Sequence, residues 1–375
     1  MDKLKIQALN PMQEEAIPSI ERNANNVLIS PTGTGKTLTF LLPVLKTLDM
    51  DCKEVQAMIL VPSRELAIQI EQVLREMGSG YKVNAVYGGR PVSKDKIELK
   101  HRPAILIGTP GRIQDHFRSN RFSKDHIRTL VLDEFDKSLE TGFEEDMKAI
   151  IRQLPKLSKR ILTSATQGLE IPGFVGMSNT VTINYAKGNT SKLAIKSVIS
   201  PSADKLNSLL ELLNFLGNKP GIIFCNFRER IQTVSEYLKK NGISQGCFNG
   251  GMEQKYRERT LIKFRNGTYQ VIVATDLAAR GIDIPELKYI IHFELPRTVE
   301  EFTHRNGRTE RVNAKGTAYV LRWEKEYLPE FVQDIPAEDI SEQASRKPQY
   351  WGTLFVSGGR KDKISKGDIA GLFFK

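Results

Sequence analysis

The segment from Ser30 to Thr37 could hold the phosphate groups of a nucleotide. It reads Ser-Pro-Thr-Gly-Thr-Gly-Lys-Thr, follows an apolar run and opens a helical pattern. Glycines let backbone N–H groups close around phosphate oxygens, and a helix N-terminus adds partial positive charge. Lys36 could reach the β- and γ-phosphates, and the Thr37 hydroxyl could ligate Mg²⁺. The predicted nucleotide contacts are therefore Thr32, Gly33, Thr34, Gly35, Lys36 and Thr37. The alternative is a glycine-rich turn without a ligand, which the strand–loop–helix context disfavours.

A pair of acids, Asp133 and Glu134, follows another apolar run, Leu130 to Leu132. Carboxylates at a strand end beside a phosphate loop suit Mg²⁺, often through a bridging water, and this role falls to Asp133. Glu134 could orient and deprotonate the attacking water. The alternative is a solvated acidic turn, such as a helix N-cap. The phosphate loop earlier in the chain favours the catalytic interpretation.

Three arginines, Arg305, Arg308 and Arg311, lie close together in the second half of the chain. Hydrolysis of a nucleoside triphosphate builds negative charge on the γ-phosphate oxygens, which an arginine finger stabilises. A helix would place Arg308 and Arg311 on one face, at positions i and i+3. The alternative is a basic solvent face or an RNA-binding patch. Only the nucleotide site in the first half makes the arginine-finger interpretation preferable.

An alternation of short apolar runs and amphipathic segments must position these residues. Continuous apolar runs suit strands that are covered on both faces, and the alternation predicts parallel sheets flanked by helices. Ligands of such sheets lie at the C-terminal ends of the strands. The predicted strands are 27–29, 58–61, 105–107, 130–132, 161–162, 221–225, 270–274, 289–293 and 316–321.

The alternation pauses twice, and these pauses predict the domain boundaries. We expect a first α/β domain at 1–186, a linker at 187–203, a second α/β domain at 204–325 and a connector at 326–348. Residues 349–375 begin with a strand-like run, Tyr350 to Val356, and end with one helical pattern. One strand and one helix cannot bury a core, so we expect part of a third domain that is cut short.

The charge balance favours a polyanionic partner. The 375 residues carry 55 Lys and Arg against 44 Asp and Glu, a formal net charge of +11. Lys and Arg displace counterions from phosphates, although a soluble basic protein without such a partner is the alternative. The three cysteines are far apart and form no CxxC pair, which indicates neither zinc nor disulfides. No signal peptide or long apolar span is visible, so we expect a cytoplasmic, monomeric protein without membrane contact.

Together, the motifs resemble the DEAD-box family of ATP-dependent RNA helicases from about Leu9 to Leu321. Each short motif is weakly specific, but their order along the chain is highly specific. The matching segments are Asn10–Gln13, Ser30–Thr37, Pro62–Ala67, Gly88–Gly89, Thr109–Arg112, Asp133–Asp136, Ser164–Thr166, Ile222–Arg228, Gln254–Arg257, Ala274–Asp283 and His304–Arg311.

The resemblance implies two tandem RecA-like P-loop domains that bind ATP, Mg²⁺ and RNA. It implies that Gln13 recognises adenine and Asp283 the ribose. The implied RNA contacts are Pro62, Arg64, Gly89, Thr109, Arg112, Gln254, Arg257 and Thr275. Residues implied to couple hydrolysis to unwinding are Ser164, Thr166, His304 and Arg305. We expect the domains to be apart without ligands and to close around ATP, bending the RNA strand out of duplex geometry.

Three residues depart from the family pattern. Phe135 replaces an alanine, Asn306 replaces an apolar residue, and Glu310 replaces a glycine beside the arginines. Phe135 and Glu310 keep open an alternative function, an ATP-gated RNA clamp or scaffold with little unwinding. A DNA translocase on the same core is a further alternative, which the motif set disfavours. The C-terminal residues resemble the opening of the DbpA-type RNA-recognition domain of bacterial helicases, which implies a role in large-subunit ribosome assembly; a basic tail without a defined fold is the alternative.

Overall fold

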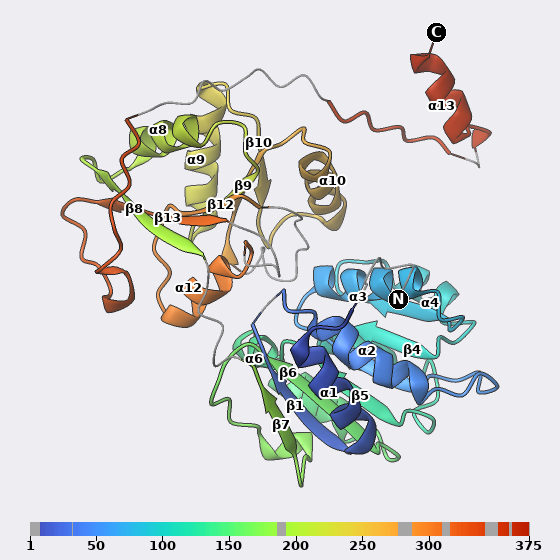
Figure 1. The fold of residues 1–375 in the computed structure, drawn as a ribbon. Coiled ribbons are helices and arrows are strands. Elements are labelled where there is room, and N and C mark those ends of the chain that lie inside the picture. The colour runs from blue at the N-terminus through green and yellow to red at the C-terminus, as the bar shows by residue number, and fades with distance from the viewer. Residues whose placement is uncertain are drawn as a thin grey trace.

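Two parallel β-sheets, one in each half of the chain, form the framework of the protein (Figure 1). The computed structural model describes residues 8–31, 33–185, 193–276, 287–309, 316–341, 352–359 and 362–374. All strand pairs within both sheets are parallel. The fold class expected from the apolar runs is therefore confirmed.

The first sheet has seven strands in the order β3-β4-β2-β5-β6-β1-β7. Its strands are β1 (Asn25–Ile29), β2 (Ala57–Leu60), β3 (Val83–Val86), β4 (Ile105–Gly108), β5 (Thr129–Leu132), β6 (Lys159–Ser164) and β7 (Val181–Asn184). Its helices are α1 (Pro11–Arg22), α2 (Lys36–Lys46), α3 (Arg64–Met77), α4 (Val92–Glu98), α5 (Pro110–Arg118), α6 (Phe135–Glu140) and α7 (Glu144–Ile151), with a 3₁₀ turn at Gly173–Val175.

The second sheet has six strands in the order β10-β11-β9-β12-β13-β8. Its strands are β8 (Ala194–Ser200), β9 (Gly221–Phe224), β10 (Gln245–Phe248), β11 (Val271–Ala274), β12 (Tyr289–His292) and β13 (Thr317–Trp323). The helices of this half are α8 (Leu206–Leu216), α9 (Arg228–Lys240), α10 (Gln254–Arg265) and α12 (Val299–Asn306), with a 3₁₀ turn at Glu330–Val332.

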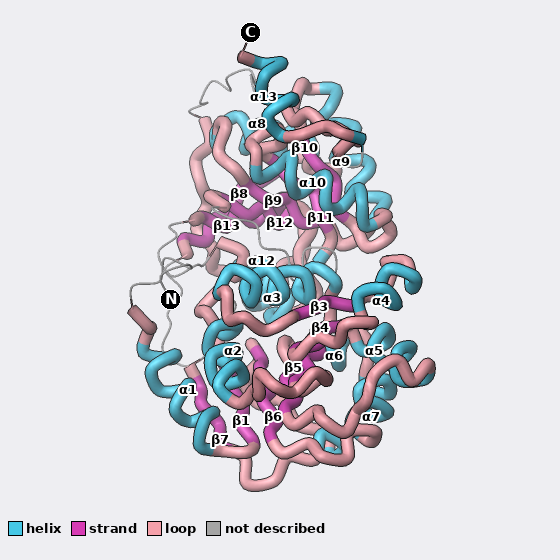
Figure 2. The backbone as a smooth tube through the Cα atoms, turned by 90° about the vertical axis from the view of Figure 1, so that its right-hand side faces the viewer, coloured by secondary structure: helices cyan, strands magenta, loops and turns pink. Residues whose placement is uncertain are grey.

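Helices lie on both faces of each sheet, as Figure 2 shows, and this explains the unbroken apolar strands. Every residue of β2, β4, β9 and β11 is buried. In each half, two large apolar clusters of described residues pack on the two faces of the sheet, and a smaller third cluster lies beside them. The strands thereby become rigid supports for the loops at their C-terminal ends.

The predicted boundary between the domains is wrong over residues 194–200. The Lys- and Ser-rich composition suggested a linker, but these residues form β8, which pairs along its whole length with β13. The predicted connector is also partly built into the second domain. Ser197 of β8 donates its N–H to Pro336 O at 2.7 Å, and Glu338 donates its N–H to Ser197 O at 2.8 Å. Strand pairing across more than a hundred residues leaves no local signal in the sequence.

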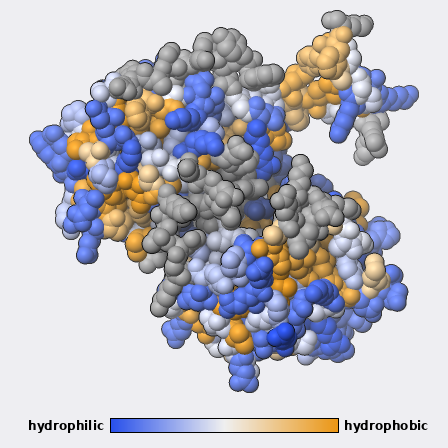
Figure 3. Space-filling view, viewed as in Figure 1, coloured by the Kyte–Doolittle hydropathy of each residue, from blue (hydrophilic) through white to orange (hydrophobic). Residues whose placement is uncertain are grey.

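The strand predicted at Tyr350 to Val356 is not formed in its described part, residues 352–356. Residues 352–359 form neither helix nor strand, and a helix, α13 (Lys366–Phe373), follows with no buried residue. The segment lies beside α10, where Thr353 and Thr268 hydroxyls are 2.7 Å apart and Phe355 packs 4.0 Å below the Arg259 guanidinium. Apolar side chains of the tail remain on the surface in Figure 3. An extended apolar run without neighbouring strands has nothing to pair with.

Candidate functional site

The order of the first sheet brings three predicted motifs to one edge. Strand β6 lies between β5 and β1, and all three run parallel. The phosphate loop follows β1, the acids Asp133 and Glu134 follow β5, and Ser164 ends β6. Because the C-terminal ends of these neighbouring strands meet, segments more than a hundred residues apart form a single site.

The phosphate loop has the backbone conformation that anion binding needs. Gly33 and Gly35 have φ of 83° and 88°, a region that residues with side chains rarely adopt. Lys36, at the start of α2, is buried and donates to Ser30 O at 2.5 Å. Burial lowers the pKa of Lys36, while the nearby carboxylates of Asp133 and Glu134 oppose that shift. A desolvated ammonium group held against the loop is suited to phosphate oxygens.

The segment before α1 supports this loop directly. Asn10 and Gln13 form a capping box at the start of α1. The Asn10 side chain donates to Thr34 O at 2.9 Å, and the Gln13 amide donates to Gly35 O at 3.3 Å. A Cβ on Gly35 would lie only 2.5 Å from the Gln13 amide nitrogen. Gln13 therefore contacts the phosphate loop, which was not expected from its implied role with adenine.

Of the two acids after β5, Asp133 is buried and Glu134 is half-buried, and both are held by Thr163 of β6. The Thr163 hydroxyl donates to Asp133 Oδ1, which also accepts the Glu134 N–H at 3.1 Å. Burial raises the pKa of both carboxyls. Glu134 has a φ of 47°, a strained conformation for a residue with a side chain. Arg308 from the second domain lies close enough to oppose the pKa shift of Glu134.

A short chain of polar contacts connects this site with the motif at the end of β6 and with α12. The Thr166 hydroxyl donates to Asp136 Oδ2 at 2.7 Å, and the Ser164 hydroxyl exchanges hydrogen bonds with the backbone of Thr166. Burial would raise the pKa of Asp136, but the Thr166 hydrogen bond and the nearby Lys137 and His304 lower it overall. The structure therefore brings Ser164, Thr166 and His304 together at the contact between the domains.

Arg305, the fourth predicted coupling residue, has a different position. It is 1 % exposed and makes a bidentate pair with Asp276, with distances of 2.6 and 2.5 Å. Its Nη1 donates to Glu294 O at 2.7 Å, and its Nη2 donates to Asn226 Oδ1, also at 2.7 Å, as well as to Asp276. These partners follow β11, β12 and β9, so Arg305 joins three strand ends of the second sheet. Its contacts are internal to the second domain.

Two of the departures from the family pattern have a structural explanation. Phe135 is 0 % exposed and belongs to the apolar cluster beneath α5 and α7, so its ring is accommodated. Asn306 Oδ1 accepts a 2.9 Å hydrogen bond from His292 Nε2 of β12, and the His292 ring stacks between Phe224 and Phe302. Burial and the Arg305 charge lower the pKa of His292 to about 3, so the ring is neutral. Asn306 is polar because it faces this histidine.

A cleft of about 580 Å³ between the domains gathers most of the predicted RNA contacts. Its lining includes Pro62, Arg64, Thr109, Arg112 and Arg257. Arg64 lies directly against the loop at Gly89, where an added Cβ would approach its guanidinium to 2.5 Å. No acid of the described residues forms an ion pair with Arg64. Thr275 lines a neighbouring cleft of about 660 Å³, beside Gly250 and Gly251.

Two of the predicted RNA-binding arginines are instead paired with acids. Arg112 is 8 % exposed and donates to Asp95 Oδ2 at 2.7 Å. Arg257 of α10 is 5 % exposed and donates to Glu65 Oε1 of α3 at 2.8 Å, across the two domains. Neither charge is freely available to a phosphate. The sequence contained no signal for these pairings, because the partners are 17 and 192 residues away.

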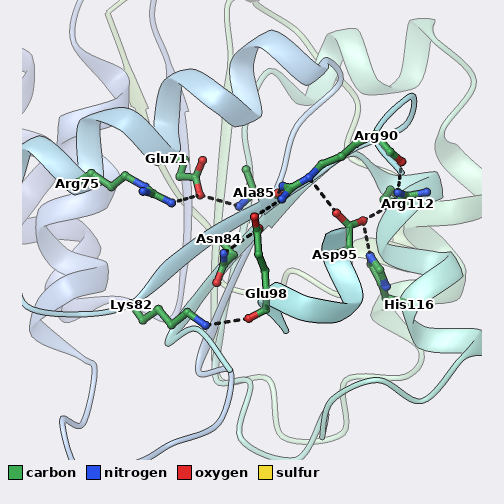
Figure 4. A network of polar contacts seen from close by, with 10 residues as sticks. All are labelled: Glu71, Arg75, Lys82, Asn84, Ala85, Arg90, Asp95, Glu98, Arg112 and His116. Carbon is green, nitrogen blue, oxygen red and sulfur yellow. Dashed lines mark hydrogen bonds and ion pairs between the residues drawn. The ribbon is translucent and has the colours of Figure 1, made fainter. Parts of the chain in front are cut away.

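Asp95 is the centre of a buried network that the sequence did not indicate (Figure 4). It is 0 % exposed, and its Oδ2 accepts hydrogen bonds from Arg112 Nε at 2.7 Å and from His116 Nε2 at 3.0 Å. Its Oδ1 lies 3.2 Å from Arg90 Nε, an ion pair without hydrogen-bond geometry. Burial would raise the pKa of Asp95, but the hydrogen bonds from His116 and Arg112 lower it overall. The network fastens α4 to α5 and fixes the loop at Gly89 against the start of α5.

Some predicted residues lie outside the described part of the chain. They are Thr32, Asp283 and Arg311, together with the family departure Glu310 and the side chain of Gln254. Their implied roles in nucleotide and RNA binding stay predictions.

Family models match both halves of the chain. Residues 10–171 match the DEAD/DEAH box helicase family, and residues 204–313 match the helicase conserved C-terminal domain. The ATP-dependent RNA helicase DbpA of Bacillus subtilis (strain 168) is 33 % identical over 400 residues, which cover 97 % of this chain and 84 % of the relative. This chain belongs to the DEAD-box family. It is an ATP-dependent RNA helicase, built as two RecA-like domains.

A further relative and two solved structures are similar to this DEAD-box helicase over most of its length. The ATP-dependent RNA helicase DbpA of Escherichia coli (strain K12) is 31 % identical over 385 residues, covering 99 % of this chain and 84 % of the relative. The structure of S. cerevisiae Dbp5 bound to RNA and ADP BeF3 matches with a TM-score of 0.76 at 28 % identity, over 86 % of this chain and 85 % of that one. The structure of Mss116p bound to ssRNA and AMP-PNP matches with a TM-score of 0.80 at 25 % identity, over 93 % of this chain and 76 % of that one.

The described helices of this DEAD-box helicase include none that is long and apolar enough to cross a membrane.

Proposed function

We propose that this helicase hydrolyses ATP when RNA is bound and uses closure of its two domains to open or remodel short RNA duplexes. The observation that carries the proposal is a site made from both domains. Arg308 of the second domain acts electrostatically on Lys36 and Glu134 of the first. A nucleotide whose phosphates lie on the loop of the first domain would have its terminal charge neutralised by arginine from the second.

In this proposal Lys36 holds the β- and γ-phosphates and Glu134 takes the proton of the attacking water. The pKa of Glu134 is raised by burial, which favours a carboxylate that can accept a proton near neutral pH. Its backbone, with φ 47°, is strained, and strained residues gather at active sites. Arg308 would stabilise the charge that develops on the γ-phosphate, together with Arg311.

The residues present also fit a magnesium ion. Asp133 uses Oδ1 for Thr163 and for the Glu134 N–H, and its Oδ2 has no hydrogen bond within the described part of the chain. Asp133, through water, and the Thr37 hydroxyl would hold Mg²⁺, which would neutralise phosphate charge when bound. Thr163 orients the carboxylate for this purpose.

The RNA strand would bind in the cleft formed by both domains. Arg64, backbone amides near Gly89, and Thr109 are suited to the phosphates, with Thr275 on the opposite side. Arg112 and Arg257 would act as positioning residues through Asp95 and Glu65. The carboxylates of Asp115 and Asp146 also line the cleft and can accept hydrogen bonds from 2′-hydroxyls, which favours RNA over DNA.

ATP turnover measured with and without RNA tests this proposal. We expect RNA to increase turnover, single-stranded DNA to increase it far less, and a short RNA duplex to open during hydrolysis. Negligible turnover with retained RNA binding would favour the ATP-gated clamp, and equal stimulation by DNA would favour a DNA translocase. A role in large-subunit ribosome assembly stays a prediction, and the same assay with ribosomal RNA fragments tests it.

A further inference from the structure

A basic groove lies on the first domain, outside both the nucleotide site and the RNA cleft. It has a volume of about 430 Å³ and is lined by Lys96, Leu99, Lys100, Arg102 and Arg121. Four of these five residues are cationic. Lys96 and Lys100 are exposed, Arg102 and Arg121 are half-buried, and Leu99 forms the apolar floor.

The positive charge of this groove is largely uncompensated. Arg102 pairs with Glu54 at 2.9 Å. For Lys96, Lys100 and Arg121, no acid of the described residues lies within ion-pair distance, and one guanidinium nitrogen of Arg121 has no hydrogen-bond partner there. Clustered like charges repel one another, so a groove of this kind gains from an anion that bridges them.

Two helices lead from the RNA cleft to the groove. Helix α5 begins after Thr109, which lines the cleft, and α4 begins shortly after Gly89. Arg118, at the end of α5, still lines the cleft, whereas Arg121, three residues later, lines the groove. Figure 2 shows α4 and α5 at the same side of the first domain. The nine residues of α5 span about 14 Å, roughly four phosphate steps along one strand.

The groove is preformed rather than created by mobile lysines. Its two walls are the end of α4 and the residues after α5, and these helices are fastened by the buried pairs of Asp95 with Arg112 and His116 (Figure 4). A fixed spacing between cations reduces the entropy that an anion must remove on binding.

We propose that this groove binds the phosphate backbone of RNA that extends beyond the cleft, as single strand or as duplex. The inference rests on the proposed function, in which the cleft holds an RNA strand. The groove would hold the flanking RNA on the first domain while the second domain moves. It would also extend the length of RNA that the protein contacts without any reading of bases, because lysine and arginine recognise phosphates independently of sequence.

Binding of three RNAs tests the groove, with each affinity measured at several salt concentrations in the presence of a non-hydrolysable ATP analogue. The RNAs are a single strand of about 6 nucleotides, one of about 15 nucleotides, and the short strand joined to a duplex. The variant is Lys96→Gln/Lys100→Gln/Arg121→Gln. The matched control, Arg22→Gln/Lys46→Gln/Lys156→Gln, removes three exposed cations elsewhere on the same domain.

We expect the groove variant to bind the short strand, and to hydrolyse ATP with it, like the wild type. We expect its affinity for at least one of the longer RNAs to fall on the order of 10- to 100-fold near 0.1 M salt, and the slope of log K against log salt to fall by about 2. Which longer RNA is affected identifies the source of the phosphates as single strand or duplex. The control should bind all three RNAs nearly as the wild type does.

Three results would overturn the proposal. In the first, the groove variant binds both longer RNAs as tightly as the wild type. In the second, it loses as much affinity for the short strand as for the longer RNAs. In the third, the control variant loses as much affinity for the longer RNAs as the groove variant does. Unchanged RNA binding with lost binding of a polyglutamate probe would instead assign the groove to an acidic protein partner. Failure of the wild type to bind the short strand would contradict the proposed function itself, and that outcome is separate from the difference between long and short RNA.

Discussion

The C-terminal edges of the two sheets both carry buried charged side chains, but in the described part of the chain these are unpaired in the first domain and paired in the second. In the first domain the buried Lys36 and Asp133 and the half-buried Glu134 form no salt bridge among the described residues, and desolvation shifts the pKa of each toward the neutral form. In the second domain the buried Arg305 has an ionic partner in Asp276 and further hydrogen bonds to Asn226 and Glu294.

We call the strand ends of the first sheet, with Lys36, Asp133 and Glu134, the reactive edge, and those of the second sheet, with Arg305, the supporting edge. Buried charges with incomplete partners are held ready for a ligand that supplies the missing charge, and such groups gather at active sites. A fully paired guanidinium stabilises the domain and has nothing left for a substrate. We therefore expect the second domain to contribute through residues that its framework positions, such as Arg308, and not through Arg305 itself.

The sharpest test of the reactive edge is Glu134→Gln. We expect turnover to fall by about 10²- to 10⁴-fold, because the amide cannot accept the proton of the attacking water. ATP binding and the stability of the first domain should be nearly unchanged. Turnover and nucleotide affinity are measured with RNA present, and Glu145→Gln, a change at an exposed carboxylate, serves as control. Turnover equal to that of the wild type would remove Glu134 from the mechanism.

The supporting edge is tested by Arg305→Met. Removing one partner of a buried, hydrogen-bonded ion pair costs about 3 kcal/mol or more of unfolding free energy, and here Asp276 is left without its cation. We expect the second domain to unfold at lower denaturant while the first domain keeps its transition, so that two transitions appear. Arg305→Lys should rescue only part of the loss, because lysine cannot form the bidentate pair. An unshifted transition would mean that Arg305 is not the support described.

Between these two edges lies the ion pair of Arg257 with Glu65, which joins the domains. We expect Arg257→Glu and Glu65→Arg each to reduce RNA-stimulated turnover about tenfold or more, since like charges then face each other in a buried contact. The double variant should recover part of the loss. The distance between the domains, followed by energy transfer between two dyes, should change in parallel. Losses of turnover that add in the double variant, without recovery, would show that this ion pair does not hold the two domains together.

The smallest effect concerns the neutral His292 in the supporting domain. Its pKa of about 3 lies below the ordinary 6.5, so the unfolded chain binds the proton more readily, and stability is lost as pH falls below about 6.5. Between pH 7 and 5.5 we expect a loss of about 1 kcal/mol from this group. The variant His292→Phe/Asn306→Leu should show a weaker dependence in thermal unfolding, because the titrating ring is gone. An identical pH profile for both proteins would contradict this assignment.

Sequence reasoning worked best where a function depends on neighbouring residues. The phosphate loop could be predicted because Gly33, Gly35 and Lys36 act through the local backbone and the start of one helix. The same holds for Asp133 and Glu134 at the end of an apolar strand. Where pairing partners were distant, reasoning from the sequence failed: residues 194–200 were taken for a linker, although β13 makes them a strand.

By itself, the sequence determined the family and the parallel α/β fold, because these follow from short motifs and the period of apolar runs, and it predicted the residues of the nucleotide site. Only the tertiary structure decided which charges are available. Arg64 faces the cleft without an acid partner among the described residues, whereas Arg112 and Arg257 are paired with Asp95 and Glu65, and Asn306 answers the buried His292. The reason is physical. The protonation state of a side chain and its availability to a ligand depend on its neighbours in space, and these are set by the tertiary fold.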